Sequence, residues 1–239
     1  MTISLVATSH GTDSTASRTA VSALVEAVRE AAPHLDVREA FVDVQLPRVD
    51  TAVDQVDGLA VIVPLLLTPG FHVRVDIQGA ADRPWVVAAG PLGADDRLTS
   101  VMLRRLARAG ATRDDVVVLG AAGSTDAAAR RSVDEAARLL AEAWGAPIDV
   151  GYVGGSGTPL AEVTAVARRD GRRLVVVSYL VGPGFFHDRL ESVGADVVTR
   201  PLLDGTEVDP DLVSLVLDRF ADAAATLDWA STSRSRTPV

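Results

Sequence analysis

The strongest constraint on the fold is an internal repeat. The segment VVVLGAAGSTDAAAR, residues 116–130, matches SLVATSHGTDSTASR, residues 4–18, which begins 112 positions earlier. In this alignment Gly123 falls on Gly11. Chance similarity between two strand–helix units is the alternative, but an internal duplication explains the match most simply. The chain is therefore expected to fold as two similar domains.

A second pair of segments supports the duplication. LVVVSYLVGPGFFHDRL, residues 174–190, is similar to LAVIVPLLLTPGFHVRV, residues 59–75, and Pro183 falls on Pro69 at an offset of 114. The boundaries that follow are an N-terminal domain over 1–111, a degenerate repeat over 112–230, and a polar tail over 231–239. That tail is expected to be disordered, because it is mostly polar.

Short apolar runs alternate with longer helical patterns, which favours a parallel sheet flanked by helices. The pattern predicts a helix that Asp13 or Ser14 caps and Pro33 ends, a helix start at Pro47, and a helix over Asp95–Ala109. Strands are expected at Ile3–Thr8, Asp36–Phe41, Leu59–Pro64 and Trp85–Ala88. The predicted fold class is α/β, with two open parallel-sheet domains facing each other across a cleft.

Composition excludes several kinds of chemistry. None of the 239 residues is a cysteine, which excludes disulfides, thiolate catalysis and cysteine-ligated metals. The sequence also has no lysine, which excludes a pyridoxal phosphate Schiff base and a P-loop. The net charge of −9 disfavours a nucleic-acid partner, which requires a basic surface.

Membrane association is also not expected. No apolar run approaches the roughly 18 residues that a membrane-spanning helix needs. The N-terminal residues lack the basic region of a signal peptide. We therefore expect a cytoplasmic protein that does not contact membranes. Because its second half can stand in for a partner, we also expect a monomer or weak homodimer.

Two histidines each follow an apolar run beside a glycine. His10 lies in Ser9-His10-Gly11, and His72 follows Pro69 and Gly70. In open parallel α/β sheets, ligands bind at the carboxyl ends of strands. Neutral imidazole binds divalent metals and accepts protons near neutral pH. The two side chains are therefore predicted to share one pocket. Taken alone, His10 could instead satisfy a hydrogen bond at the strand end, and His72 could be a surface residue on a loop.

Other candidates are weaker. Asp43 follows a predicted strand and is expected to guide a cation or orient an imidazole, with a helix cap as the alternative. His34 is interpreted as a solvated residue at a helix end. The role of His187 stays open, with a place at the ligand rim as the weaker alternative.

These motifs resemble the sirohydrochlorin chelatase family, the class II tetrapyrrole chelatases that insert iron or cobalt. The family pattern has a strand followed by Ser-His-Gly, an Ala-Phe-Leu-Glu-like strand end, and Val-Pro-Leu-Leu-Leu before a Gly-x-His. The matching segments here are 9–11, 40–43 and 63–72. Asp43 stands in place of the more usual glutamate.

The resemblance implies a function. Its substrate is a metal-free isobacteriochlorin with eight carboxylates, and its product is siroheme or a cobalt chelate on the way to cobalamin. The family's metal-binding and proton-accepting histidines correspond to His10 and His72. Fe²⁺ or Co²⁺ enters as a substrate, and no organic cofactor is expected.

Further residues are expected to contact the substrate. Ser9, Gly11, Asp43 and Gly70 adjoin the two histidines, and Arg74 is the arginine closest to them in sequence. Arginines are expected to offset the carboxylates of the substrate locally, because the chain as a whole is acidic. The sequence therefore predicts that Arg74→Ala raises the substrate KM.

Two rival functions remain open from the residues alone. The Ser-His-Gly motif is similar to the Arg-His-Gly signature of histidine phosphatases, although Ser9 stands where that signature has its phosphate-binding arginine. A carrier or sensor that holds a divalent metal with two histidines, without catalysis, is the second rival.

Overall fold

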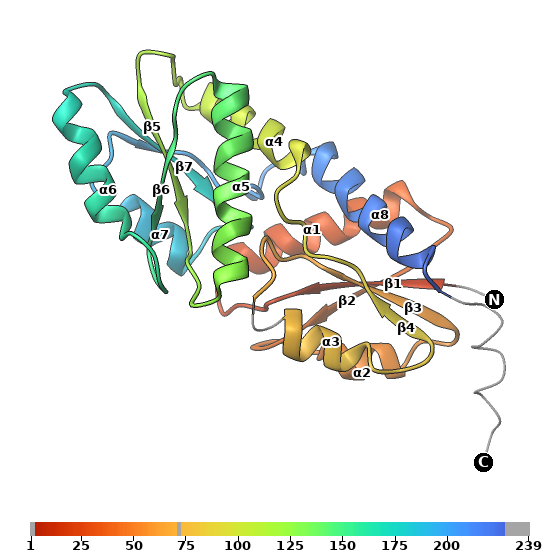
Figure 1. Ribbon diagram of the computed structural model, residues 1–239. Helices are drawn as coiled ribbons and strands as arrows, with labels where there is room; N and C mark the ends of the chain where they lie inside the picture. The colour runs from red at the N-terminus through yellow and green to blue at the C-terminus, as the bar shows by residue number, and fades with distance from the viewer. Residues whose placement is uncertain (1–2, 71–72, 228–239) are drawn as a thin grey trace.

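Each half of the chain forms one four-stranded parallel sheet with helices on both faces (Figure 1). The computed structural model describes residues 3–70 and 73–227. The strand orders are β2-β1-β3-β4 in the first sheet and β6-β5-β7-β8 in the second. These orders are equivalent, so the predicted fold class of two similar α/β domains is confirmed.

The first sheet agrees closely with the sequence pattern. Its central strands are β1, Ile3–Ser9, and β3, Leu59–Pro64, which pair with each other along their length. Both strands are almost wholly buried, as expected for continuous apolar runs covered on two faces. The outer strands are β2, Asp36–Phe41, and β4, Val86–Ala88.

Helix α1, Thr15–Ala31, packs one apolar face on the first sheet. The Ser14 hydroxyl caps it by accepting a hydrogen bond from the Ser17 N–H, so the expected cap is confirmed. Helix α4, Asp96–Arg108, is capped in the same way by the Asp95 carboxylate. The short helices of this half are α2, Val49–Asp54, a single wide turn at Val73–Ile77, and α3, Gln78–Ala80.

The prediction that Pro47 begins a helix is wrong. Arg48 is the N-cap of α2, whose first residue is Val49. Pro47 lies outside the helix, where its carbonyl accepts a hydrogen bond from the Phe41 N–H at 3.0 Å. Pro47 therefore lies in the loop between β2 and α2, where it is hydrogen-bonded to the last residue of β2. Helix α2 begins two residues later.

The second half follows the same order. Helix α5, Ala127–Trp144, is the counterpart of α1, and its N-cap Asp126 occupies the position of Ser14 in the repeat. The remaining elements are β5 Val116–Ala121, β6 Asp149–Tyr152, α6 Leu160–Ala167, a helical turn at Arg168–Asp170, β7 Leu174–Tyr179, α7 Phe185–Glu191, β8 Val197–Val198 and α8 Pro210–Ala224.

The two halves exchange one helix each. Helix α4 belongs to the first half in sequence but packs on α5 and β7, whereas α8 packs on α1, β3 and β4 (Figure 1). The exchanged helices also contact each other, where Arg104 of α4 binds Asp209 at the start of α8 at 2.8 Å. The predicted domain boundary between residues 111 and 112 stays a prediction. Each lobe contains one helix, α4 or α8, that the boundary would assign to the other domain.

This exchange fixes the lobes to each other. Arg105 of α4 forms an ion pair with Asp204, and both side chains are less than one-tenth exposed. The Tyr179 hydroxyl of β7 donates to the Gly93 carbonyl at 2.9 Å. One apolar core runs through both lobes. The expected disordered tail, 231–239, lies outside the described residues.

Candidate functional site

Strands β1 and β3 end at the same edge of the first sheet. Thr8 pairs with Pro64, and the Leu65 N–H continues the pairing by donating to the Thr8 carbonyl at 2.8 Å. The residue that follows β1 is His10, and the segment that follows β3 is 65–70. The sheet therefore carries both predicted loops to one edge, as the rule for parallel α/β sheets requires.

A third loop is attached to His10 through the main chain. The Asp43 N–H donates to the His10 carbonyl at 2.9 Å, and the Val42 N–H donates to the Ser9 carbonyl at 3.0 Å. Gly11 has φ +86°, and a Cβ there would lie 2.1 Å from the Asp43 carbonyl oxygen. Glycine is therefore required in Ser-His-Gly for close approach of the Asp43 loop.

The Asp43 carboxylate lies near His10 and remains ionised. A hydrogen bond from the Val44 N–H and an ion pair with Arg48 at 3.0 Å lower its pKa, and positive charge on His10 acts in the same direction. The carboxylate is exposed rather than inserted into a helix cap. Helix α2, which follows this loop, has Arg48 as its N-cap and no side-chain cap hydrogen bond, and the expected action of Asp43 on a cation or an imidazole stays a prediction.

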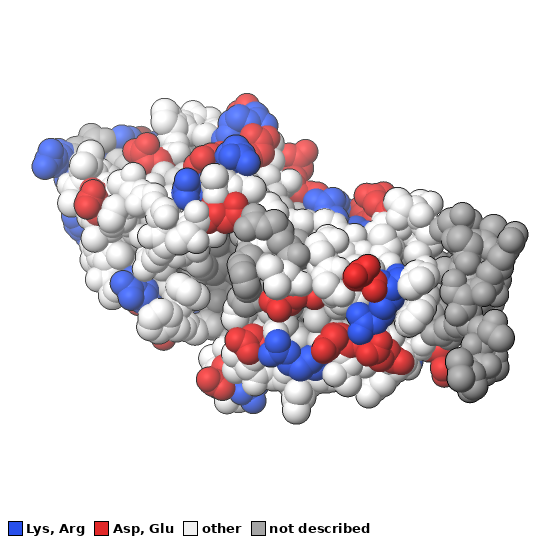
Figure 2. Space-filling view, turned by 60° about the horizontal axis from the view of Figure 1, so that its bottom comes forward, with Lys and Arg blue, Asp and Glu red and all other residues white. Residues whose placement is uncertain are grey.

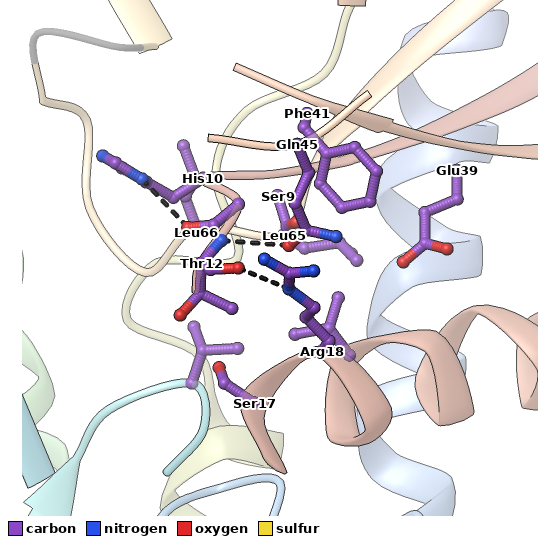
Figure 3. Close-up of a pocket in the computed structure, with 13 residues that line it drawn as sticks. Ser9, His10, Thr12, Ser17, Arg18, Glu39, Phe41, Gln45, Leu65 and Leu66 are labelled. Atoms are coloured by element: carbon purple, nitrogen blue, oxygen red, sulfur yellow. Dashed lines mark hydrogen bonds between the residues drawn. The ribbon is translucent and has the colours of Figure 1, made fainter. Parts of the chain in front are cut away.

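His10 is exposed at the strand end and is among the residues that line two cavities. Its Nδ1 lies 3.3 Å from the Gly11 carbonyl, and the tautomer that donates this hydrogen bond carries its lone pair on Nε2. In Figure 3 the ring points away from Arg18 and Glu39. His10 can therefore present a basic nitrogen outside the small pocket that those two residues line.

This small pocket, of about 100 Å³, lies at the end of the first sheet (Figure 3). Ser9 lines it and is buried. Glu39 also lines it, and burial raises the pKa of this carboxyl despite hydrogen bonds from Ser22. Sequence reasoning missed Glu39 because a charged residue within an edge strand usually faces solvent.

A cavity of about 740 Å³ lies between the two lobes. Its volume is within the range of typical small-molecule sites. Both halves line it, and most of the lining is apolar. The N-terminal half contributes residues including His10, Gly11, Val44, Leu66, Leu67 and Gly70, and the C-terminal half contributes residues including Arg130, Tyr152, Tyr179, Leu180, Phe185 and Phe186.

The charges around this region are mixed. On the face in Figure 2, acidic and basic side chains are interspersed over both lobes. Among the described residues that line the cavity, Asp13 is the one acidic residue and Arg130 is the one arginine. A strongly anionic ligand would therefore meet local cations rather than a broad positive surface.

The remaining predicted residues have different outcomes. Gly70 lines the large cavity together with His10. His72 lies outside the described residues, and the side chain of Arg74 is likewise not described, so both roles stay predictions. Arg74 belongs to the helical turn Val73–Ile77.

The two other histidines are placed as follows. His34 is exposed just beyond α1, as expected for a solvated residue. His187 does not shape the ligand rim, because it is buried and its Nδ1 lies 3.3 Å from the Ser178 hydroxyl. Burial lowers the pKa of His187. The rim instead carries the preceding residues, Phe185 and Phe186.

Several lining residues were not predicted. Arg130 marks the repeat in sequence but was not assigned to the site, and Val44 had no sequence signal. Val44 has φ +61°, which is rare for a β-branched residue and is found at strained sites. The exposed pair Phe185 and Phe186 follows a Pro-Gly turn that corresponds to Pro69-Gly70, and this correspondence could have identified it.

Within residues 3–70 and 73–227, no three His, Cys, Asp or Glu side chains gather as a metal-binding group. Over the same ranges, no helix has the length and apolar character that crossing a membrane requires.

Comparison with known proteins agrees with this geometry. Residues 4–109 match the CbiX family. A sirohydrochlorin ferrochelatase of Priestia megaterium is 28% identical over 142 residues, which cover 54% of this chain and 53% of that protein. The alignment therefore spans about half the length of this curated relative.

Solved structures extend the likeness to both lobes. SirB from Bacillus subtilis with Fe³⁺ superposes with a TM-score of 0.78 at 20% identity, covering 96% of this chain and all of that one. SirB from Bacillus subtilis subspecies spizizenii in complex with cobalt gives 0.73 at 20% identity, with the same coverage. At these identities the superpositions establish the fold.

The sequence match covers the half that carries His10, and the structural match covers nearly the whole chain. The order of the strand-end motifs, the duplicated sheets and both comparisons agree. Residues 4–109 are therefore similar in sequence to the CbiX family, and nearly the whole chain has the fold of sirohydrochlorin chelatase structures.

Proposed function

We propose that this protein inserts a divalent metal ion, Fe²⁺ or Co²⁺, into sirohydrochlorin or a closely related tetrapyrrole. The observation that carries the proposal is the position of His10, at a strand end that borders a mostly apolar cavity between two chelatase-like lobes. The cavity suits the apolar faces of a macrocycle, and the imidazole suits both the metal and the protons that the metal displaces.

The reaction requires proton removal. As the metal binds the four ring nitrogens, two of them lose their protons, so one metal ion enters and two protons leave. A neutral imidazole at His10 can hold the incoming ion loosely and then accept a proton. His72, two residues after the cavity-lining Gly70, is the proposed second base and metal ligand.

Asp43 is proposed to assist His10. Its carboxylate remains ionised, and Arg48 holds it next to the His10 turn. A negative charge at this position attracts a divalent cation and stabilises the imidazolium that forms when His10 accepts a proton. The carboxylate therefore acts on the metal or on His10.

Imidazole ligands accept both iron and cobalt, and affinity alone separates the two ions weakly. We propose that metal supply decides which chelate forms. Siroheme or a cobalt precursor of cobalamin is then the product. When the macrocycle fills the cavity, it displaces water. This would favour replacement of the water molecules on the metal ion by the ring nitrogens.

The test is an anaerobic absorbance assay of sirohydrochlorin with Fe²⁺ or Co²⁺. Wild-type protein is compared with His10→Ala, His72→Ala and the double variant. His34→Ala is the matched control, since His34 is exposed and is not among the residues that line the cavity. Faster chelate formation by wild type and His34→Ala, but not by the double variant, supports the proposal. A wild-type rate equal to the protein-free rate with both metals contradicts it.

A further inference from the structure

The two halves of the repeat place equivalent arginines at the start of equivalent helices. Arg18 lies on α1 and Arg130 lies on α5, 112 residues apart. The turn before each helix has the same internal hydrogen bond: the Ser14 N–H donates to the Thr12 hydroxyl, and the Asp126 N–H donates to the Ser124 hydroxyl, both at 3.1 Å. The local backbone that carries the two arginines is therefore conserved between the halves of this chain.

The first arginine is bound within its own half. The Arg18 Nε donates to the Thr12 carbonyl at 2.6 Å, and its Nη2 forms an ion pair with Asp13 at 3.4 Å. Arg18 lines the small pocket. Its guanidinium is thus occupied by the turn that precedes α1.

The second arginine lacks this carboxylate. The repeat places Thr125 where the first half has Asp13. The Arg130 Nη1 makes one long hydrogen bond, 3.4 Å, to the Thr125 carbonyl. No carboxylate of residues 3–70 or 73–227 lies within ion-pair distance of its guanidinium. The threonine at position 125 therefore leaves Arg130 without the carboxylate that Asp13 provides for Arg18.

Arg130 also borders the large cavity, on the side formed by the second half. Tyr152 lines the same cavity. Burial raises the pKa of this tyrosine, Asp134 acts in the same direction, and the positive charge of Arg130 opposes them. The guanidinium therefore interacts electrostatically with Tyr152 in the cavity wall as well as with the Thr125 carbonyl. Among the described residues that line the cavity, Arg130 is the one arginine.

The neighbouring surface of the second half is aromatic. Phe185 and Phe186 line the cavity with 67% and 46% of their surface exposed, and their rings meet edge to face at 5.4 Å. Large apolar side chains that remain exposed at a cavity mark a surface that a ligand covers. A flat macrocycle with carboxylate-bearing side chains fits both parts of this surface. Its face can cover the two phenylalanine rings, and a carboxylate at its edge can bind the Arg130 guanidinium.

We propose that Arg130 binds a carboxylate of the macrocycle substrate, and that the second half thereby orients the ring toward His10. The inference rests on the proposed function for the identity of the substrate. Arg130 is a positioning residue, because a carboxylate at the edge of the ring is remote from the nitrogens that exchange protons for metal. A bidentate guanidinium–carboxylate contact fixes orientation as well as affinity.

The test measures binding without metal. Quenching of sirohydrochlorin fluorescence gives the Kd for wild type, Arg130→Gln, Arg130→Lys and Arg131→Gln. Arg131 is the matched control, because it is adjacent on α5 and exposed but is not among the described residues that line the cavity. Arg130→Gln should weaken binding about tenfold, the order expected for one charge-assisted hydrogen-bonded pair.

The other variants sharpen the assignment. Arg130→Lys should recover part of the affinity, since it keeps the charge but loses the bidentate geometry. Arg131→Gln should bind like wild type. In the metal-insertion assay, Arg130→Gln should raise KM with little change in kcat. Thermal unfolding of both glutamine variants should match wild type, because both side chains are at the surface.

Equal Kd values for Arg130→Gln and Arg131→Gln would overturn the inference. The binding assay contains no metal, so it separates this inference from the proposed function. A wild-type protein that binds the macrocycle through Arg130 but inserts neither ion would contradict the chelatase proposal and support the carboxylate site.

Discussion

The main-chain carbonyl of Asp43 occupies the space that a side chain on Gly11 would need. A Cβ at position 11 would lie 2.1 Å from that oxygen. The second half repeats this arrangement, with a Cβ at Gly123 lying 1.9 Å from the Gly154 carbonyl. Each turn at the end of a central strand is therefore packed against a neighbouring loop in a way that only glycine permits.

Gly11→Ala should displace the Asp43 loop from His10 and lower both stability and chelatase activity. Gly110→Ala is the matched control, because Gly110 also has positive φ but has open space around its Cβ position. The control should lose about 1 kcal/mol of unfolding free energy, the ordinary cost of alanine in the left-handed region. Urea unfolding and the metal-insertion assay measure the two effects. Equal losses for both variants would show that the close approach to Asp43 has no consequence.

Val44→Gly should stabilise the protein and weaken substrate binding. Val44 has φ +61° and lines the large cavity. Glycine removes the backbone strain, for a gain of about 1 kcal/mol after its greater unfolded-state entropy is included. Val44→Ala removes a similar apolar contact but keeps the strain, so it should not be stabilised. An unfolding midpoint for Val44→Gly at or below that of Val44→Ala would contradict this account.

Asp204→Asn should destabilise the protein strongly. It leaves the Arg105 guanidinium buried without its carboxylate, a change that costs about 3–5 kcal/mol in comparable buried pairs. Glu135→Gln is the comparison, since it breaks an exposed ion pair with Arg138 and should leave the unfolding midpoint nearly unchanged. The measurement is urea denaturation at neutral pH. Similar midpoints for the two variants would show that the Arg105–Asp204 pair does not fasten α4 to the segment before α8.

His187 should make the protein lose stability in mild acid. Burial lowers its pKa in the folded state, against the opposing charges of Glu191 and Asp188. As the pH falls below 6.5, the ordinary value for histidine, the unfolded chain binds a proton that the folded chain resists, so unfolding becomes more favourable. The effect is absent well above pH 6.5 and grows down to the folded-state pKa.

His187→Asn should reduce this acid-induced loss, whereas His34→Asn should not, because His34 is exposed. Urea midpoints at about pH 7.5 and about pH 5.5 measure the difference between the two conditions. An identical pH dependence in wild type and His187→Asn would exclude His187 as the source.

The local sequence was sufficient to predict most elements around the site. Short strand-like runs predicted β2 at Asp36–Phe41 and β3 at Leu59–Pro64 with the bounds that the structure has. The polar residue after such a run, His10, could be assigned to a ligand-binding edge because parallel strands end together. Pro47 was misassigned, since a proline that suits a helix start also suits the preceding loop.

The sequence by itself determined the duplication, the parallel sheets and the strand end that carries His10, because these depend on periodicity and on residues close in the chain. Only the tertiary structure decided that α4 and α8 exchange lobes, that Asp43 meets Gly11, and that Arg130 borders the cavity without the carboxylate that holds Arg18. An amphipathic helix specifies that one face is buried but not which sheet buries it. That choice depends on contacts between residues about a hundred positions apart, such as Arg105 and Asp204.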